Sequence, residues 1–406
     1  MKIKNDFGLC RVADPRSGER GYKAPVACFI AVFLVFNVNL LRAGSADQFP
    51  IGMYGLTMAC TNDFPILKDA GFNCVQSYRG FEPLDGFMKE CERHGFKLLI
   101  SPGTSAGPSF NENTMKNFVA RTGTSAPLLG WYMIDEPDFQ KIAPTDVERC
   151  RNALKSTGTK FPSVIVLSDG KSAGFYASTA DILMVDWYPI PHLPLASFGT
   201  AVRQGRFAAG PDKPVWGVVQ AFDWVSLFPR AGRLNASRFP SRQEMRALAL
   251  LGVVEGASGL FFFVHQDGER LEPITQRGED WNRLKPVVQE LARQAPVLGS
   301  PTIWSPVKQH IEKDKLRWRN VLGDEALQAA RKRLKEDREG FVAGDYLLVV
   351  NTTSEQRASQ IWVPGLKDGE VKVDGKDEPA TIHNGWIMDD FEPYATRIYG
   401  PLPLRE

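Results

Sequence analysis

The sequence predicts an α/β protein, a closed (β/α)8 barrel followed by a C-terminal antiparallel β-sandwich. Two observations predict this fold class. Between residues 49 and 294, short apolar runs alternate with amphipathic helical patterns eight times, which is typical of a parallel sheet built from βα units. From residue 341 onward, short alternating runs are separated by turn residues such as Pro364-Gly365 and Asn384-Gly385, which is typical of antiparallel strands.

Each barrel strand is expected to lead into a helix, and several of these helices carry start and stop signals. Ser241 with Glu244 three residues later is a capping-box pattern, while Gly71 and Gly256 follow helices at positions where glycine permits a left-handed conformation. Eight strands, eight crossovers and roughly 250 residues favour a closed barrel over an open sheet. The expected strands are residues 51–58, 73–77, 97–101, 128–134, 163–167, 182–186, 215–220 and 259–264.

The first 46 residues are interpreted as a targeting segment. Basic residues precede an apolar run at 24–41, and the small residues 43–46 follow in the pattern of a cleavage site. A secretory signal peptide is favoured, and a membrane anchor through residues 24–41 is the alternative; both predict a secreted, periplasmic or otherwise extracytoplasmic protein. The predicted domains are residues 47–300 for a catalytic barrel and 301–406 for a linker and β-sandwich.

Composition limits the classes of partner. With 24% charged residues and a formal net charge of +2, the chain gives no electrostatic reason to expect a nucleic-acid partner. The four cysteines after residue 46 form no CxxC pair, so we expect buried free thiols or at most one disulfide, and neither a metal site nor another cofactor. Residues 307–340 are rich in charge and predict a solvated connection or an exposed helix.

The strongest candidate for chemistry follows the fourth expected strand, which runs directly into Asp135-Glu136-Pro137. Catalytic groups of such barrels cluster at the carboxyl ends of the strands. Two adjacent carboxylates there either serve a substrate site or have a structural role, capping the next segment or pairing with an arginine. Burial and a neighbouring negative charge both raise a carboxyl pKa, so Glu136 is predicted to be a protonated general acid for a departing sugar oxygen.

Other strand ends supply further candidates. Period-two alternation places Asp186 and Tyr188 on one face after the sixth strand, which makes Asp186 a second candidate catalytic carboxylate beside Asp135. An aromatic floor with a few amides and carboxylates suits a polyhydroxylated ligand, so an oligo- or polysaccharide is the expected partner. The predicted substrate-binding residues are Tyr54, Arg79, Trp131, Tyr188, Gln220, Phe222 and His265.

The run Gly130-Trp131-Tyr132-Met133-Ile134-Asp135-Glu136-Pro137 resembles the fourth-strand motif of TIM-barrel glycoside hydrolases. Segments 185–189 and 214–222 resemble parts of other barrels in that superfamily, and 391–399 is similar to the end of their C-terminal β-domains. The resemblance implies a glycosidase with Glu136 as the acid. The large retaining group carries Asn-Glu on the fourth strand and a nucleophilic Glu on the seventh, but Asp135 and Gln220 occupy these positions here. An amide cannot form the glycosyl ester.

Two mechanisms therefore rank above standard double displacement. An adjacent Asp-Glu pair resembles the N-acetylhexosaminidases that use substrate assistance, which implies that Asp135 orients the sugar's acetamido group while Glu136 donates the proton. The other is inversion, with Asp186 as the base across a gap of ~6.5–9.5 Å that admits water. Because of Gln220, a non-catalytic carbohydrate-binding protein on the same barrel is the alternative function.

Overall fold

The computed structural model describes residues 49–405, apart from residues 79–83, 123–126, 228–236, 267–271, 304–306, 312–316 and 320–325. The predicted targeting segment at residues 1–46 and the predicted binding residue Arg79 lie outside the described residues. In the described part of the chain, no helix combines the length and the apolar character that crossing a membrane requires.

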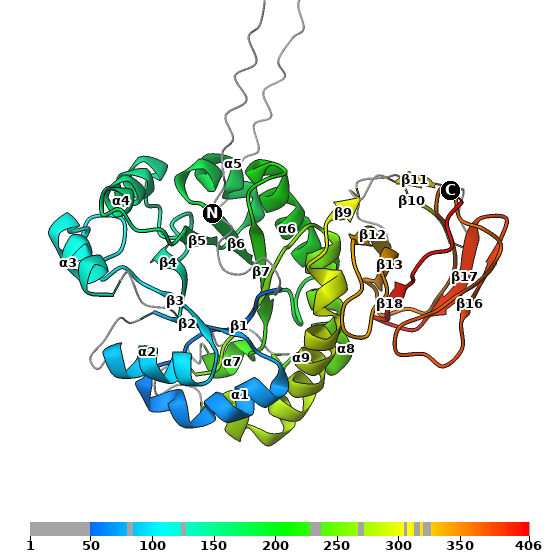
Figure 1. Cartoon of the computed structure of the whole chain (residues 1–406), viewed down its shortest axis with the longest axis horizontal. Helices are drawn as coiled ribbons and strands as arrows, with labels where there is room; N and C mark the ends of the chain where they lie inside the picture. The colour runs from blue at the N-terminus through cyan, green and yellow to red at the C-terminus, as the bar shows by residue number, and fades with distance from the viewer. Residues whose placement is uncertain are drawn as a thin grey trace, which may run out of the picture. The chain divides into compact units, whose positions relative to one another are not determined.

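Eight parallel strands close into a barrel in chain order, with β1 paired to both β2 and β8. The strands lie inside a ring of helices (Figure 1). The predicted fold class is confirmed, and β4 to β7 begin and end at the predicted residues. The strands are β1 Ile51–Met53, β2 Cys74–Ser77, β3 Lys97–Ile100, β4 Leu128–Ile134, β5 Ser163–Leu167, β6 Ile182–Asp186, β7 Val215–Gln220 and β8 Leu260–Phe263.

The helices carry the terminal signals seen in the sequence. Ser241 and Glu244 form both hydrogen bonds of the capping box at the start of α8, and Gly71 and Gly256 have φ angles of 102° and 104°. The α-helices are α1 Phe64–Ala70, α2 Leu84–Arg93, α3 Glu112–Thr122, α4 Pro144–Ser156, α5 Ala173–Tyr176, α6 Ala196–Ala209, α7 Trp224–Leu227, α8 Arg242–Val254 and α9 Gly278–Leu298. The 3-10 helices are η1 Met58–Asp63, η2 Gly170–Ser172, η3 Ala177–Thr179 and η4 Ile274–Gln276.

The first strand is shorter than predicted. It ends at Met53, and the chain turns through Gly55, whose φ of 80° lies in the left-handed region. A Cβ atom at Gly55 would lie 2.6 Å from the carbonyl oxygen of Gln266, so the backbone approaches the end of β8 closely here. The apolar run at 51–58 is therefore divided between a strand, a turn and the start of η1.

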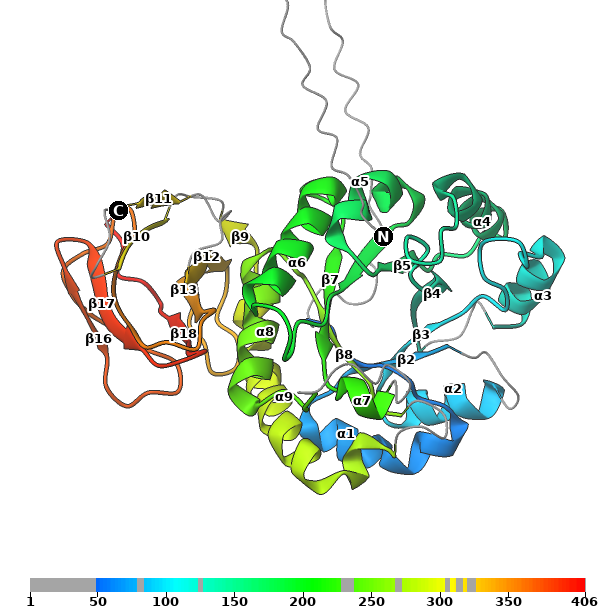
Figure 2. The same ribbon diagram turned by 180° about the vertical axis from the view of Figure 1, so that it is seen from behind.

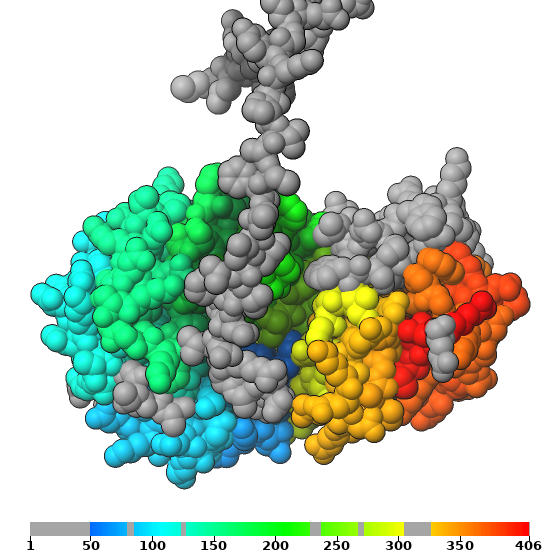
Figure 3. All heavy atoms as spheres, turned by 45° about the horizontal axis from the view of Figure 1, so that its top comes forward, coloured from blue at the N-terminus to red at the C-terminus, as the bar shows by residue number. Residues whose placement is uncertain are grey.

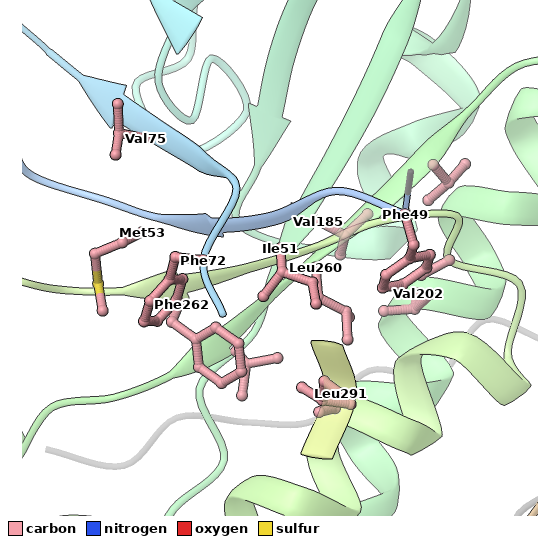
Figure 4. Close-up of a cluster of buried hydrophobic side chains, with 14 of the residues drawn as sticks. Phe49, Ile51, Met53, Phe72, Val75, Val185, Val202, Leu260, Phe262 and Leu291 are labelled. Atoms are coloured by element: carbon pink, nitrogen blue, oxygen red, sulfur yellow. The ribbon is translucent and has the colours of Figure 1, made fainter. Parts of the chain in front are cut away.

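The barrel has an inner and an outer apolar layer. Inward side chains of alternating strand positions form one cluster, in which Phe261 lies so close to β1 that a Cβ atom at Gly52 would be 2.1 Å from its ring. The other face of the strands packs on the helices, where Ile51 and Phe262 lie in the same cluster as Leu291 of α9 (Figure 4). This arrangement leaves only the strand ends for polar chemistry.

Two antiparallel sheets follow the barrel (Figure 2). One has the order β11-β10-β14-β17-β16-β15 and the other β18-β13-β12-β9. They share an apolar core that includes Leu347, Ile361 and Phe391, which confirms the predicted sandwich. The strands are β9 Thr302–Ile303, β10 Val307–Ile311, β11 Arg317–Arg319, β12 Leu327–Leu334, β13 Gly344–Asn351, β14 Arg357–Trp362, β15 Gly369–Val371, β16 Ala380–His383, β17 Trp386–Phe391 and β18 Thr396–Tyr399.

The sandwich packs on helices of the barrel. Tyr346 and Leu348 of β13 belong to the same apolar cluster as residues of α8 and α9. Arg293 of α9 donates two hydrogen bonds to the carboxylate of Asp374, of 2.6 and 2.7 Å. Helix α9 contacts β12 and α8 contacts β13, and in the space-filling view yellow atoms of residues near position 300 lie beside the orange atoms of the β-domain (Figure 3). The described residues of the barrel and of the sandwich accordingly belong to one compact unit.

The expectation of a solvated connection or exposed helix at residues 307–340 is wrong. Strands β10, β11 and β12 lie in this range, and β12 is almost entirely buried. Its charged residues are compensated by partners: Arg331 donates to Asp345, and Lys332 donates to the carbonyl oxygen of Ser300 at 3.1 Å. Charged side chains can be buried when they have hydrogen-bond partners, so this buried strand has the charge-rich sequence that is expected of a surface segment.

Lys332 is expected to make stability depend on pH. Its burial lowers the pKa of its ammonium group from 10.5 to about 8. Between these values the unfolded chain holds the proton and the folded chain does not, so the contribution of Lys332 to the free energy of unfolding rises with pH. We expect the advantage of Lys332→Met over the wild type to shrink by roughly 2 kcal/mol from pH 7 to pH 9.5. Urea unfolding of both proteins across this range measures it; a difference that is independent of pH would contradict the shift.

Candidate active site

The Asp135-Glu136 pair follows β4 at the end of the barrel where all eight strands terminate. A register shift between Tyr132 and Ile134 interrupts the pairing of β4 with β5 just before it. Glu136 has a φ of 41°, in the left-handed region that a residue with a side chain enters at a cost of about 1–3 kcal/mol. Its amide donates to the carbonyl oxygen of Val166 on β5 at 3.1 Å. The backbone is thus fixed where it presents the carboxyl group.

Two hydrogen bonds fix the position of Asp135. The hydroxyl group of Tyr132 donates to Asp135 Oδ1, and the side-chain amide of Gln140 donates to the carbonyl oxygen of Asp135. Tyr132 is an inward residue of β4 in the inner barrel cluster. The aspartate is therefore oriented by the barrel interior, and the residue as a whole is half-buried.

Asp186 completes a group of three carboxyls. It is the last residue of β6, only 7% exposed, and the Tyr188 hydroxyl donates to its Oδ2 at 3.2 Å. This contact confirms that Asp186 and Tyr188 share a face. The carboxyl groups of Asp186 and Glu136 also interact with each other and influence each other's pKa. Residues 50 positions apart in the chain thus meet at one point.

Burial raises the pKa of all three carboxyls, and repulsion by neighbouring carboxylates adds to it for Glu136 and Asp186. Burial is the largest cause for each of them, and the negative charge of Asp135 raises the pKa of Glu136 further. The pKa of Asp186 lies well above its ordinary value because of its burial and the charges of Glu136 and Asp135. Two carboxyls in contact cannot both ionise freely, so Glu136 and Asp186 titrate as a pair that retains a proton.

Buried carboxylates elsewhere in the chain behave differently. Glu244 is paired with Arg238 at 2.6 Å and Asp374 with Arg293 at 2.6 Å. Although burial alone would raise them, the pKa values of both carboxyls are lowered by these arginines. In the ion pairs formed among the described residues, neither Asp135, Glu136 nor Asp186 takes part. Among the described residues, the alternative of a structural arginine pair thus finds no support, and carboxyls of raised pKa without a cationic partner are typical of functional sites.

Aromatic rings surround the carboxyls. The rings of Tyr54 and Tyr78 each lie about 6 Å from the ring of Tyr132, with centroid distances of 6.0 and 5.9 Å. On the other side, Tyr188 stacks on Phe263 at 5.7 Å and meets Phe222 edge-on at 5.0 Å. Tyr54 and Phe222 are fully buried, so these two predicted binding residues lie beneath the surface as a floor, whereas Tyr78 is 39% exposed.

The structure does not bring three of the predicted binding side chains to the carboxyls. Trp131 faces outward from β4, where its indole donates to Thr159 Oγ1 at 2.9 Å. Gln220 is fully buried and bonds to the backbone N–H and carbonyl of Ile190 at 3.0 and 2.8 Å, which fastens the β6–α6 loop. His265 is fully buried beside Asp63. Buried hydrogen-bonded groups have no capacity left for a sugar.

Sequence reasoning missed Tyr132 and Asp138. Tyr132 could have been found from alternation, because Trp131 and Tyr132 are adjacent and cannot both point inward. Asp138 accepts hydrogen bonds from the backbone N–H groups of Ser168 and Asp169, both at 3.1 Å, and its charge also raises the pKa of Glu136. These contacts join the loops that follow β4 and β5, and no local pattern indicates them.

In the parts of the chain that the structure describes, no cluster of three or more His, Cys, Asp or Glu residues is arranged to hold a metal ion. The four described cysteines, Cys60, Cys74, Cys91 and Cys150, are buried and free, which confirms the prediction of free thiols.

Solved structures with the same fold are glycoside hydrolases. An α-amylase from Anoxybacillus matches with a TM-score of 0.56 and 9% identity, covering 89% of this chain and 99% of that one. The α-amylase of Geobacillus thermoleovorans complexed with acarbose matches with a TM-score of 0.53 and 10% identity, over 89% and 99%. Gan42B, a family 42 β-galactosidase of G. stearothermophilus, matches with a TM-score of 0.52 and 9% identity, over 89% and 99%.

At such low identities the likeness concerns the fold alone. The chain has the fold of the TIM-barrel glycoside hydrolases, including a β-domain after the barrel, as the resemblance in its sequence implied. No protein-family model matches the chain, and no curated protein sequence does so.

Proposed function

We propose that this protein is a glycosidase that hydrolyses an O-glycosidic bond, with Glu136 as the general acid and Asp135 and Asp186 assisting. The observation that carries the proposal is the group of three carboxyls of raised pKa, without a cationic partner among the described residues, at the open end of a barrel. A carboxyl that keeps its proton near neutral pH is what protonation of a departing sugar oxygen requires.

The contacts of the site favour substrate assistance over inversion. Inversion requires ~6.5–9.5 Å between the two carboxyls to admit water, whereas the carboxyl groups of Glu136 and Asp186 interact with each other. Gln220 supplies no nucleophile on β7, since it is an amide bound to the backbone of Ile190. Asp135, oriented by Tyr132, remains free to polarise an acetamido group of the substrate. We therefore propose a 2-acetamido sugar at the reacting position, with Asp186 holding the proton that Glu136 delivers.

An oligo- or polysaccharide is the proposed partner, and action outside the cytoplasm is the proposed location. The aromatic floor around Tyr132 and Tyr188 suits the apolar faces of sugar rings. The solved α-amylase complex with acarbose is in keeping with a carbohydrate ligand for this fold. The location rests on the sequence of residues 1–46, where an apolar run follows basic residues.

The experiment that tests the proposal is product analysis on a panel of glycosides, with and without a 2-acetamido group. Release of a reducing sugar from at least one acetamido substrate is expected. A second candidate, the non-catalytic carbohydrate-binding protein, is motivated by the amide of Gln220 where a carboxylate would be needed for double displacement. Calorimetry separates the two, because tight binding of a glycan that is never cleaved supports the second candidate and contradicts the first.

The pH dependence of the rate provides a further prediction for Asp135→Asn. Burial is the main cause of the raised pKa of Glu136, and the charge of Asp135 is the next. Removing that charge lowers the pKa of Glu136, so the acid loses its proton at a lower pH. The descending limb of kcat/KM against pH is expected to move to lower pH, with kcat reduced by up to about 100-fold. Asp169→Asn, at the cap of η2, is the control, and a limb that stays in place in Asp135→Asn argues against the coupling.

A further inference from the structure

The turn that follows β4, residues 135–142, places Glu136 in a strained backbone conformation. Four non-glycine residues among those that the structure describes have a positive φ, and two of them, Glu136 at 41° and Lys141 at 58°, lie in this turn. A residue with a side chain enters this region at a cost, so it stays there only where its surroundings hold it. The contacts that hold the turn therefore decide where the carboxyl group of Glu136 lies.

Backbone hydrogen bonds stabilise the turn internally. The amide of Gln140 donates to the carbonyl oxygen of Glu136 at 2.9 Å, and the amide of Ile142 donates to the carbonyl oxygen of Pro137 at 2.8 Å. These bonds join residues of the turn to one another, but they do not attach it to the barrel. Attachment requires partners on other elements, such as Val166 of β5, whose carbonyl oxygen accepts from the Glu136 amide at 3.1 Å.

The carboxylate of Asp138 attaches the turn to the chain that follows β5. Its Oδ1 accepts from the backbone N–H of Ser168 at 3.1 Å, while its Oδ2 accepts from the N–H of Asp169 at 3.1 Å and from the Ser168 hydroxyl at 3.2 Å. Three donors thus converge on one carboxylate, and hydrogen bonds to an ionised acceptor are stronger than neutral ones. At the far end of the turn, the Tyr176 hydroxyl of α5 donates to the carbonyl oxygen of Ile142 at 2.6 Å.

We propose that Asp138 is a positioning residue, whose carboxylate attaches the turn after β4 to the chain after β5 and thereby holds Glu136 in its left-handed conformation. Asp138 lies two residues after Glu136, so a movement of the turn at Asp138 also moves the carboxyl group of Glu136. Burial is the largest cause of the raised pKa of Glu136, the charge of Asp135 is the next, and the charge of Asp138 adds to them. The attachment is independent of the proposed glycosidase activity, whereas its consequence for the rate rests on that activity.

Hydrogen exchange of the full chain tests the attachment whatever the activity of the protein. In Asp138→Asn the amide nitrogen cannot accept a hydrogen bond, so donors on Ser168 and Asp169 lose their partner. We expect the amides of Glu136 and Gln140 to exchange at least about tenfold faster than in the wild type, because the turn opens more often. The amides of α8 should exchange at wild-type rates, which reports that the fold is retained. Unchanged exchange at Glu136 and Gln140 overturns the proposal.

Two further variants accompany this measurement. Asp146→Asn removes a carboxylate that pairs with Arg149 on α4, and as the matched control it should leave exchange in the turn unchanged. Ser168→Ala removes only the hydroxyl donor to Asp138. Should Asp138→Asn not fold, Ser168→Ala decides the proposal: exchange at Glu136 at least about threefold faster supports it, and unchanged exchange overturns it.

Kinetics separates positioning of the acid from a purely structural role. On aryl glycosides of 2-acetamido-2-deoxyglucose, kcat of Asp138→Asn is expected to fall about 10- to 100-fold with a weakly acidic phenol and less than about threefold with a very acidic one, which departs without an acid. KM should change little, because the side chains around the sugar stay the same. An equal loss with both phenols overturns the positioning of Glu136 by Asp138. Absence of turnover in the wild type would contradict the proposed function instead, and hydrogen exchange then decides the attachment.

Discussion

Glu136→Gln is expected to lower kcat by about 10²–10⁴-fold on natural glycosides while the fold is retained. The substitution keeps the size of the side chain but removes the transferable proton. It also replaces one of two coupled, buried acids with a neutral amide. The repulsion between Glu136 and Asp186 is thereby removed, so the stability of the barrel should not fall. Steady-state kinetics and circular dichroism measure both effects.

The matched control for this variant is Glu148→Gln. Glu148 lies on α4, the helix that follows the Asp135-Glu136 pair, and its side chain is exposed. Its substitution should leave kcat within about twofold of the wild type, because no contact joins it to the three carboxyls. If Glu136→Gln retained near-normal turnover on every substrate that the wild type cleaves, Glu136 could not be the proton donor.

Asp345→Asn is expected to destabilise the protein by about 3–5 kcal/mol. Asp345 is 4% exposed and accepts hydrogen bonds from both Arg331, at 2.5 and 3.0 Å, and Arg333, at 2.6 and 2.9 Å. Arg331 is only 8% exposed, so loss of the carboxylate leaves a buried, charged guanidinium group without its counter-charge. Urea unfolding at pH 7 measures the change.

The stabilisation by Asp345 and its two arginines depends on pH in a defined way. Burial would raise the pKa of Asp345, but the two arginines lower it below its ordinary value. A carboxyl whose pKa is lower in the folded than in the unfolded chain stabilises the protein at pH values above the unfolded-state pKa. This stabilisation is lost as the pH falls through the folded-state pKa. The difference between wild type and Asp345→Asn should therefore be full at pH 7 and shrink in acid. Asp377→Asn, at an exposed turn, is the control; an Asp345→Asn effect below about 1 kcal/mol would contradict the account.

The barrel could be predicted from the sequence because its strands carry their own boundaries. β4 to β7 are nearly continuous apolar runs, buried on both faces and ended by polar or turn residues, so their limits are local properties. The side of the barrel to which Asp186 and Tyr188 point also follows from alternation alone. The fold and the place of the candidate carboxyls can therefore be predicted from short segments of the sequence.

The parts that could not be predicted depend on partners far away in the chain. β12 was taken for a surface segment because Arg331 is charged, and only Asp345 on the neighbouring strand explains its burial. Gln220 is at a strand end, as expected, but its bonds to Ile190 use up the amide. The contact of Glu136 with Asp186 likewise arises from the closure of the barrel. Such pairings are properties of the tertiary structure, which no local pattern records.

The central claim is that Glu136 gives its proton to the leaving group. The dependence of the activity on the acidity of the leaving group tests this claim most directly. We compare wild type and Glu136→Gln on aryl glycosides whose phenols range from very acidic to weakly acidic. A phenolate that departs unaided needs no acid. The account predicts that Glu136→Gln retains most of its activity with the most acidic phenol and loses progressively more as the leaving group becomes more basic. An equal loss for every leaving group would contradict it.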